Sequence, residues 1–282
     1  MEVTVEQVRA FSGAPKELIS DERIKILIST NRAKTEDLFG VKFVPTKRVE
    51  TLNGEFKRKL VVSEYFPLTT LKLINGETEI DTNNLYEHTE LGFIEIITLP
   101  TTFNLRGGIG SGFSGYNLDV KVKYLYGAIE RDTSFQYETE SDISKGNNVV
   151  VELDDTNNLV VGDWVFIEDL NKRKEVAQIS DINFSTNNVT FKQLTKGFKS
   201  GALVSKARPM RIFMEYLLYE CALAVAIEAI GSTYTFNTSY SIEGVSATRG
   251  VPYTHWRESA SRSQSLRDEL KVRIQSMLTA LV

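Results

Sequence analysis

Apolar positions recur with a helical period near the beginning of the chain. Thr4 and Gln7 have the spacing of a capping box, which predicts a short helix over 4–11. The acidic residues that follow Ser20 suit the positive end of a helix dipole and open a second predicted helix, over 20–40. Its expected buried stripe consists of Ile24, Leu27, Ile28, Asn31, Thr35 and Leu38.

The same period returns near the end of the sequence. Pro209 suits the first turn of a helix, and the predicted helix over 209–230 is apolar and rich in alanine. A polar passage over 232–252 separates it from the last predicted helix, over 254–281. The buried stripe expected on that helix consists of Leu266, Leu270, Ile274, Met277, Leu278 and Leu281.

Between these helices the pattern is typical of strands. Asn53-Gly54 separates two β-like runs, 46–52 and 55–62, and therefore predicts a hairpin between them. A second Asn-Gly pair, at 75–76, follows the run 67–74. Further strands are predicted over 92–99 and 117–126, the latter with apolar residues at every second position.

The segment 138–207 has the pattern of a small all-β domain. Five short runs, separated by turn-forming pairs, predict strands over 149–153, 163–168, 175–182, 189–194 and 202–206. Five such strands can bury a core by closing into a small barrel. We therefore expect an α+β fold in which residues 1–137 and 208–282 form a discontinuous domain and 138–207 is inserted into it.

Composition narrows the function classes. The 282 residues are 41% hydrophobic, which favours a folded protein, and the net charge of −4 argues against coating of nucleic acid. Cys221 is the one cysteine and there are two histidines, so an internal disulfide and a Cys/His zinc site are excluded. The sequence has no apolar run of ~20 residues, and its polar start is unlike a secretory signal. We expect a protein made in the cytoplasm, without a membrane partner.

The candidate catalytic motifs have simpler interpretations. Gly110–Gly115 matches G-x-G-x-x-G, but a strand rather than a helix is predicted after it, which argues against a dinucleotide site. His88 and His255 belong to no cluster, Cys221 is expected to be a buried inert thiol, and Asp154-Asp155 is typical of a turn. We therefore predict no catalytic, cofactor-binding or metal-binding residues, and no enzyme activity.

Two basic clusters and one strand with aromatic residues are further candidates for binding. Lys57-Arg58-Lys59 and Lys172-Arg173-Lys174 are interpreted as solvated loops, because the aromatic residues that single-strand binders interleave are missing around them. In the strand over 163–168, alternation places Trp164 and Phe166 on one face and Val165 and Ile167 on the other. The sequence leaves open which of these faces is core.

The order of segments resembles the head–tail connector (adaptor) family of tailed bacteriophages. The resemblance covers about 200 residues outside the insertion, and it rests on the N-terminal helix pair and on five later motifs. These motifs are Leu60-Val61-Val62 with Phe66–Leu71, Leu91–Ile96, the strand Val120–Tyr126 that ends in Tyr-x-x-Gly at Gly127, Pro209-Met210-Arg211-Ile212, and Tyr240–Ser246. In that family the Tyr-x-x-Gly strand leads almost directly into the Pro-initiated helix, whereas here the β segment intervenes.

The resemblance implies a structural virion protein at the neck of the particle. Such proteins form a homo-oligomeric ring, typically twelve-fold, beneath the portal protein. The ring extends the channel for double-stranded DNA, without sequence-specific binding, and provides a platform for the tail or a second connector (stopper) protein. The inserted domain is expected to face outward, toward the major capsid protein or a neighbouring neck protein.

The polar passage over 232–252 is the expected assembly element. Its alternating residues Tyr234, Phe236, Tyr240 and Ile242 would add a strand to a neighbouring subunit or partner. Two other functions remain open at this point. One is a different neck or tail protein, such as a tail terminator or baseplate component; the other is a carbohydrate- or ligand-binding β protein that uses Trp164 and Phe166.

Overall fold

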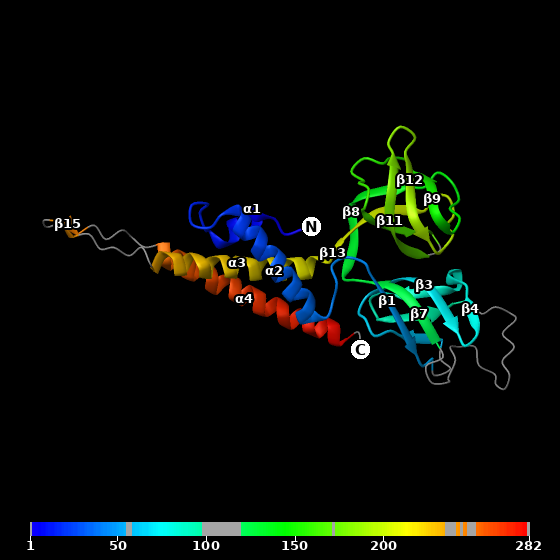
Figure 1. The fold of residues 1–282 in the computed structure, drawn as a ribbon, viewed down its shortest axis with the longest axis horizontal. Helices are drawn as coiled ribbons and strands as arrows, with labels where there is room; N and C mark the ends of the chain where they lie inside the picture. The colour runs from blue at the N-terminus through cyan, green and yellow to red at the C-terminus, as the bar shows by residue number, and fades with distance from the viewer. Residues whose placement is uncertain are drawn as a thin grey trace. The chain divides into compact units, whose positions relative to one another are not determined.

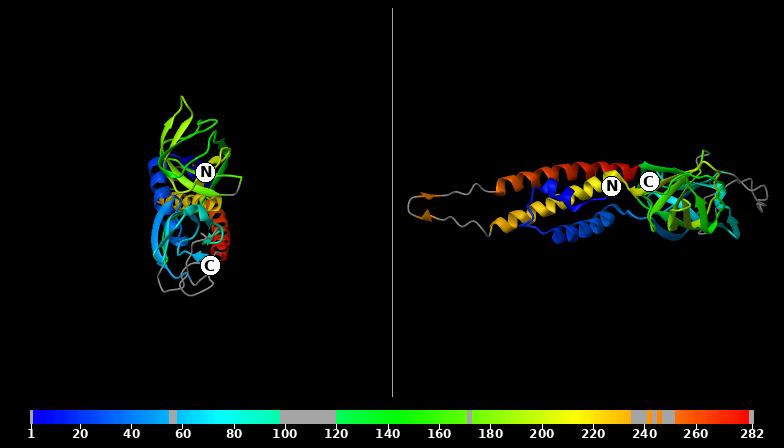
Figure 2. Two further views of the ribbon diagram at one scale, coloured as in Figure 1. Left: turned by 90° about the vertical axis from the view of Figure 1, so that its right-hand side faces the viewer. Right: turned by 90° about the horizontal axis from the view of Figure 1, so that it is seen from above.

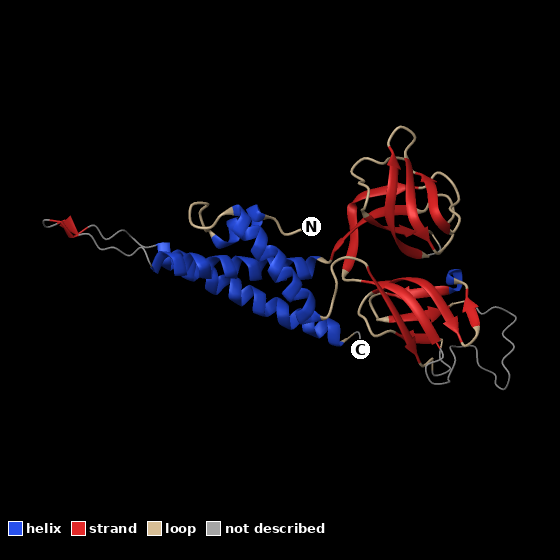
Figure 3. Ribbon diagram, viewed as in Figure 1, coloured by secondary structure: helices blue, strands red, loops and turns tan. Residues whose placement is uncertain are grey.

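The computed structural model describes residues 2–54, 58–97, 120–170, 173–234, 241–242, 245–246 and 252–280. Its described helices longer than one turn come from the two ends of the chain, and most of its strands from the middle (Figure 3). Two compact units result: Met1–Phe39 with Met210–Thr279, and Gly40–Pro209. This segregation of helices from antiparallel sheets is an α+β fold, as the sequence predicts.

The helical unit contains α1 (Val5–Ser12), α2 (Asp21–Phe39), α3 (Arg211–Tyr234) and α4 (Pro252–Thr279). Helix α3 contacts each of the other three, and it runs beside α4 over much of its length (Figure 2). The predicted capping box is confirmed, because the Thr4 side chain accepts from the Gln7 amide and the Gln7 side chain accepts from the Thr4 amide. Gly13 ends α1 in the left-handed conformation.

Small and apolar side chains form the core of the helical unit. Ala222, Ala226 and Ala229 of α3 are fully buried, which permits the close approach of neighbouring helices. On α4 the predicted stripe is confirmed at Leu270, Ile274 and Leu278, which are buried, as are Trp256 and Ser263. Leu266 and Met277 are half-buried, and Leu281 lies outside the described residues.

Two details of the predicted helices are wrong. Pro209 is the last residue of a strand and not part of the first helical turn, because it pairs with Ile129 across a sheet; the helix begins at Arg211. Leu38 is 50% exposed, since its neighbour Phe39 takes the buried position at the end of α2. The Phe39 ring packs edge-on against Phe213 and Tyr216, with centroids 5.7 and 5.0 Å away.

Gly40–Pro209 begins with two antiparallel sheets that share one core. The four-stranded sheet has the order β1 (Thr46–Leu52), β7 (Val120–Tyr126), β3 (Pro67–Asn75), β4 (Thr78–Ile80). The three-stranded sheet has the order β2 (Lys59–Val61), β6 (Phe93–Ile96), β5 (Leu85–His88), and a short 3₁₀ helix, η1 (Thr82–Asn84), precedes β5. Their common core includes Leu60, Leu73, Ile94, Val122 and Tyr124.

The hairpin predicted at Asn53-Gly54 is wrong. Strand β1 pairs with β7, and β2 pairs with β6, so the two runs belong to different sheets. Local turn chemistry was outweighed here by burial, because β7 has the alternating buried residues that a central strand needs. The second Asn-Gly pair does form a tight turn, between β3 and β4, with Gly76 at φ 63°.

A six-stranded antiparallel sheet completes Gly40–Pro209. Its order is β8 (Ile129–Glu138), β13 (Leu203–Pro209), β10 (Trp164–Glu168), β11 (Lys174–Asn183), β12 (Asn188–Leu194), β9 (Gly146–Glu152) (Figure 1). Just beyond the two outer strands, Thr139 and Leu153 form an antiparallel bridge. The five predicted strands are present, and β8 is an addition that lies mostly before the expected boundary at 138; the domain boundaries themselves stay a prediction.

Candidate functional site: the junction of the β-sheets

The chain enters and leaves the six-stranded sheet at one place. Ile129, the first residue of β8, is the register partner of Pro209, the last residue of β13. Just before β8, the Gly127 amide donates to the Phe66 carbonyl (3.1 Å) and the Ala128 amide donates to the Lys42 carbonyl (2.7 Å). The segment 129–209 therefore begins and ends on adjacent strands, between the end of β7 and the start of α3.

A buried ion pair joins the six-stranded sheet to the three-stranded sheet. Lys196 Nζ, on the turn after β12, lies 2.5 Å from Glu87 Oε2 on β5, and the two residues are 1% and 0% exposed. The ammonium group also donates to the carbonyls of Leu85 and Lys174, each at 3.2 Å. The other Glu87 oxygen accepts from the Thr70 amide at 2.8 Å. Both charges are thus compensated where water is excluded.

A second buried carboxylate holds the same turn in place. Glu175, on β11, accepts from the amides of Thr195 (2.7 Å) and Lys196 (2.9 Å) and from the Thr195 hydroxyl (3.0 Å). Burial raises the pKa of Glu175 to about 7, although these hydrogen bonds and the nearby Lys196 charge act in the opposite direction. The turn that carries Lys196 is therefore fixed by its own sheet before it contacts Glu87.

The apolar part of the junction settles which face of β10 is core. Val165 and Ile167 are fully buried inside the six-stranded sheet. Phe166 lies on the opposite face, in a second cluster with Leu68 and Leu125 of the four-stranded sheet, and Trp164 packs against that cluster. Both faces are therefore packed, and Phe166 is an inter-sheet contact rather than an open ligand contact.

Hydrogen bonds reinforce this second cluster. The Thr69 hydroxyl accepts from the Val176 amide at 2.7 Å, which ties β3 to β11. The Thr82 hydroxyl donates to the Thr195 carbonyl at 2.5 Å. Together with the ion pair, these contacts make the three sheets one packed body.

The two basic clusters have aromatic neighbours that the sequence did not reveal. Lys59 Nζ lies 4.6 Å from the centre of the Phe93 ring, and Lys174 Nζ lies 5.3 Å from that of Tyr86. Between these rings is His88, which stacks on Phe93 (4.3 Å), contacts Tyr86 edge-on (4.7 Å) and places Nε2 2.8 Å from Glu95 Oε2. These aromatic residues come from β5 and β6, so only the strand register brings them beside the lysines. Lys57 and Lys172 lie outside the described residues.

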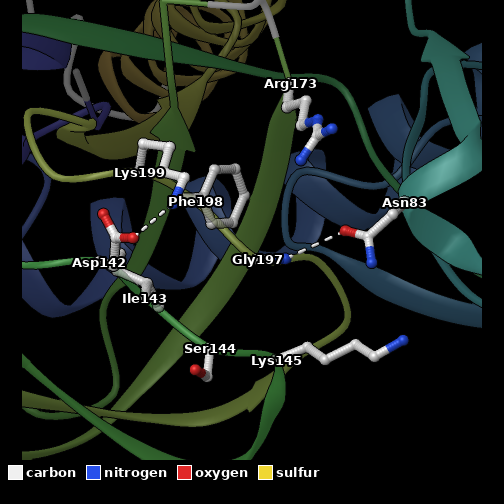
Figure 4. Close-up of a pocket in the computed structure, with 9 residues that line it drawn as sticks. All are labelled: Asn83, Asp142, Ile143, Ser144, Lys145, Arg173, Gly197, Phe198 and Lys199. Atoms are coloured by element: carbon white, nitrogen blue, oxygen red, sulfur yellow. Dashed lines mark hydrogen bonds and ion pairs between the residues drawn. The ribbon is translucent and has the colours of Figure 1, made fainter.

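Several concavities open at the junction of the sheets. One, of about 520 Å³, contains Arg173, Lys145 and Lys199 (Figure 4). Several of its polar groups have partners: Lys199 binds Asp142 (2.6 Å), Lys145 binds Asp81 (3.1 Å), and the Gly197 amide donates to Asn83 (3.2 Å). Another is a groove of about 490 Å³ between the four-stranded and six-stranded sheets, with Leu125 and Trp164 among its lining residues.

The remaining sequence candidates lie apart from this junction. Cys221 is buried in α3, where burial raises its pKa to about 12, as expected for an inert thiol. Asp154 accepts from the Glu138 amide, and Asp155 accepts from the amides of Thr156 and Asn157, so the pair lies just before the turn at 157–158 rather than in it. The Gly110–Gly115 motif lies outside the described residues, and His255 belongs to α4.

The predicted assembly residues fall where little is described. Tyr234 is the last residue of α3, and Ile242 belongs to β14 (Ser241–Ile242), which pairs with β15 (Val245–Ser246). Phe236 and Tyr240 lie outside the described residues. Their predicted role in assembly stays a prediction.

The described residues contain neither a metal-ligand cluster nor a membrane-spanning helix. No group of three or more His, Cys, Asp or Glu side chains in the described part of the chain is arranged to hold a metal ion. Among the described helices, none is long and apolar enough to cross a membrane.

Sequence reasoning missed the residues that form the junction. Glu87, Glu175 and Lys196 stand in runs that read as ordinary half-polar strands and a loop, and only the packing of two sheets makes them buried. A comparison of the sequence with models of known protein families finds no match, and a comparison with curated proteins finds none either.

Proposed function

We propose that this chain is a structural subunit of a phage neck, a head–tail connector that assembles into a ring beneath the portal. The observation that supports this most is the path of the chain at Ile129 and Pro209. Without residues 129–209, the end of β7 would lead directly to the start of α3, which is the order of elements that the resemblance to connectors implies. The segment 129–209 then has the position of an inserted domain, and we propose that it corresponds to the barrel-like module expected from the sequence.

The helical unit offers surfaces for self-association. It is built from the two ends of the chain, and ion pairs hold its helices together: Arg9 with Asp21 (2.5 Å), Arg23 with Glu228, and Arg267 with Glu220 (3.2 Å). Large apolar side chains remain exposed on three helices, and the clearest cases are Ile26, Ile227 and Val272. A neighbouring subunit in a ring would cover such positions.

The inserted segment has exposed apolar residues on its loops. Leu170 follows β10 and is 94% exposed, and Phe184, at the β11–β12 turn, is 63% exposed. We propose that these loops contact the capsid or an adjacent neck protein. Deletion of the segment would be a poor test, because it would leave Glu87 without Lys196 and would uncover Leu68 and Leu125. Point substitutions at Leu170 and Phe184 avoid this damage.

Electron microscopy of the purified full-length protein tests the proposal, with native mass spectrometry to count subunits. We expect closed rings with a central hole. The number of subunits bound per portal separates a connector from a tail terminator. Ile227→Glu should reduce the ring fraction without lowering the melting temperature, whereas Ser261→Glu, at an exposed position of α4, is the matched control. A protein that stays monomeric at high concentration, even with portal-bearing capsids, would contradict the proposal.

A further inference from the structure

The groove between the four-stranded and six-stranded sheets has the lining of a ligand site. Its volume of about 490 Å³ lies within the ~300–1,000 Å³ that is usual for small-molecule pockets. Leu71 and Leu125 contribute apolar surface from the four-stranded sheet, and Trp164 contributes an indole from β10. The Trp164 side chain is only half-buried, although it packs against the apolar cluster behind it. The groove therefore contains an aromatic surface that is partly open.

Polar side chains without partners surround this apolar surface. Asn147, Asn148, Gln193, Lys47 and Lys192 line the groove, and their side chains have no hydrogen-bond or ion-pair partner among the described residues. In the concavity of Figure 4, by contrast, Lys199, Lys145 and Asn83 are engaged by Asp142, Asp81 and the Gly197 amide. These five side chains of the groove are thus available to a ligand, whereas Gln178, which also lines the groove, donates to the Gly162 carbonyl at 3.2 Å.

The charges of the lining residues favour a ligand of negative charge. Lys47 and Lys192 bring two ammonium groups from β1 and β12, that is, from different sheets. Among the described residues, no carboxylate lines the groove itself; Glu79 and Asp81 line the adjoining concavity, which shares Leu71, Asn147 and Gln193 with it. A ligand with a negative group would therefore gain charge-assisted hydrogen bonds, whereas a cationic ligand would be repelled.

We infer that this groove binds an acidic saccharide, a sugar chain that carries a carboxylate. Amide side chains both donate and accept hydrogen bonds, which suits the hydroxyl groups of a sugar. An exposed indole suits the apolar face of a sugar ring, and the two lysines suit the carboxylate. Lys47 of β1 and Asn147 of β9 belong to outer strands of their sheets, so addition of an extended peptide to one of these strands is the competing outcome, which the glutamate peptide in the test distinguishes.

Titration of the full-length protein with sialyllactose, followed by tryptophan fluorescence and calorimetry, tests the inference. Lactose is the neutral control ligand, and a short glutamate peptide is the control for a protein segment. We expect sialyllactose to change the fluorescence, and lactose to bind at least about tenfold more weakly, because it lacks the carboxylate. Lys192→Gln and Lys47→Gln should each weaken sialyllactose binding about tenfold.

Two further variants keep the test specific. Trp164→Phe retains an aromatic ring in the packed cluster and should abolish the fluorescence response, because Trp164 is the tryptophan that lines the groove. Lys199→Gln, in the concavity of Figure 4, should leave binding unchanged. The inference is overturned if sialyllactose does not bind, if both lysine substitutions leave its affinity unchanged, or if only the glutamate peptide binds. None of these outcomes depends on ring assembly.

Discussion

Lys196 and Glu87 form a salt bridge of 2.5 Å between two sheets, and neither side chain is reached by solvent. The residues lie far apart in the sequence, one on each side of the proposed insertion boundary. Because a buried charge without its partner is costly, this pair makes the packing of 129–209 against the preceding sheets all-or-none. The inserted segment is therefore expected to unfold together with the sheets that carry it.

Removal of one charge of this pair should be much worse than removal of both. Lys196→Met leaves the Glu87 carboxylate buried and unpaired, and should lower the free energy of unfolding by ~3–5 kcal/mol. Glu87→Gln keeps an acceptor for the Thr70 amide but leaves the ammonium group unpaired. The double variant should cost clearly less than the sum of the two single changes, as urea denaturation would measure in a double-mutant cycle.

The exposed pair of Lys199 and Asp142 is the control for this cycle. Their side chains are 77% and 60% exposed, so Lys199→Met should have no measurable effect on stability. Strict additivity of Glu87→Gln and Lys196→Met would contradict the coupling between the sheets.

Glu175 should make the stability of Gly40–Pro209 depend on pH. Its pKa is raised by burial, from 4.5 to about 7, so the folded state holds a proton that the unfolded state has lost between these two values. The contribution is fully present below pH 4.5 and is lost as the pH rises toward 7, with a size on the order of 2–3 kcal/mol. Unfolding free energies measured from pH 4.5 to 7.5 should decline less steeply in Glu175→Gln than in the wild type.

Substitution of an exposed glutamate controls for the loss of a negative charge as such. Glu152 lies on the outer strand β9 and is exposed to solvent, so Glu152→Gln should leave the pH profile unchanged. Identical slopes for Glu175→Gln and the wild type would show that Glu175 titrates normally.

Cys221 should be unreactive until the helical unit unfolds. Burial raises its pKa to about 12, so little thiolate exists at neutral pH, and the Asn31 side chain donates to its sulfur at 3.7 Å. A thiol reagent at pH 8 should label no cysteine in the native protein and one in denaturant. Rapid labelling of the native protein would mean that α2 and α3 do not pack as described.

Hydrophobic periodicity predicted the helices and most strands, but it did not predict which strands pair with each other. The helices, the turn at Asn75-Gly76 and the strands within 138–207 follow from local patterns, since capping, turn chemistry and alternation are short-range effects. Strand pairing is long-range. Strand β1 pairs with β7, more than sixty residues later in the sequence, so the local signal at Asn53-Gly54 predicted the wrong partner for β1. The junction residues Glu87 and Lys196 could not be predicted, because their burial exists only after two sheets have packed.

Amide hydrogen exchange would test the predicted assembly element. In the helical unit, Ile242 of β14 pairs with Val245 of β15, so this hairpin has its own hydrogen bonds before any partner is added. If the hairpin adds to a neighbouring sheet, its remaining amides gain partners in the ring, and exchange over 240–247 should slow by at least about tenfold on assembly. Equal exchange in the free and assembled protein would exclude strand addition.

Gly127 should tolerate no side chain. A Cβ atom there would lie 3.2 Å from the Lys42 carbonyl oxygen and 3.3 Å from that of Val44, and φ is 159°. These neighbours are backbone atoms of the segment before β1 and cannot move aside without disturbing the Ala128–Lys42 hydrogen bond. Gly127→Ala should therefore lower the free energy of unfolding by ~1–3 kcal/mol. Gly231, inside α3, meets no atom within 4 Å, so Gly231→Ala should instead stabilise the protein by ~0.5–1 kcal/mol. Opposite shifts of the denaturation midpoint in these two variants would show that glycine is required at 127 because the backbone of residues 42–44 approaches closely there. An unchanged midpoint for Gly127→Ala would contradict this explanation.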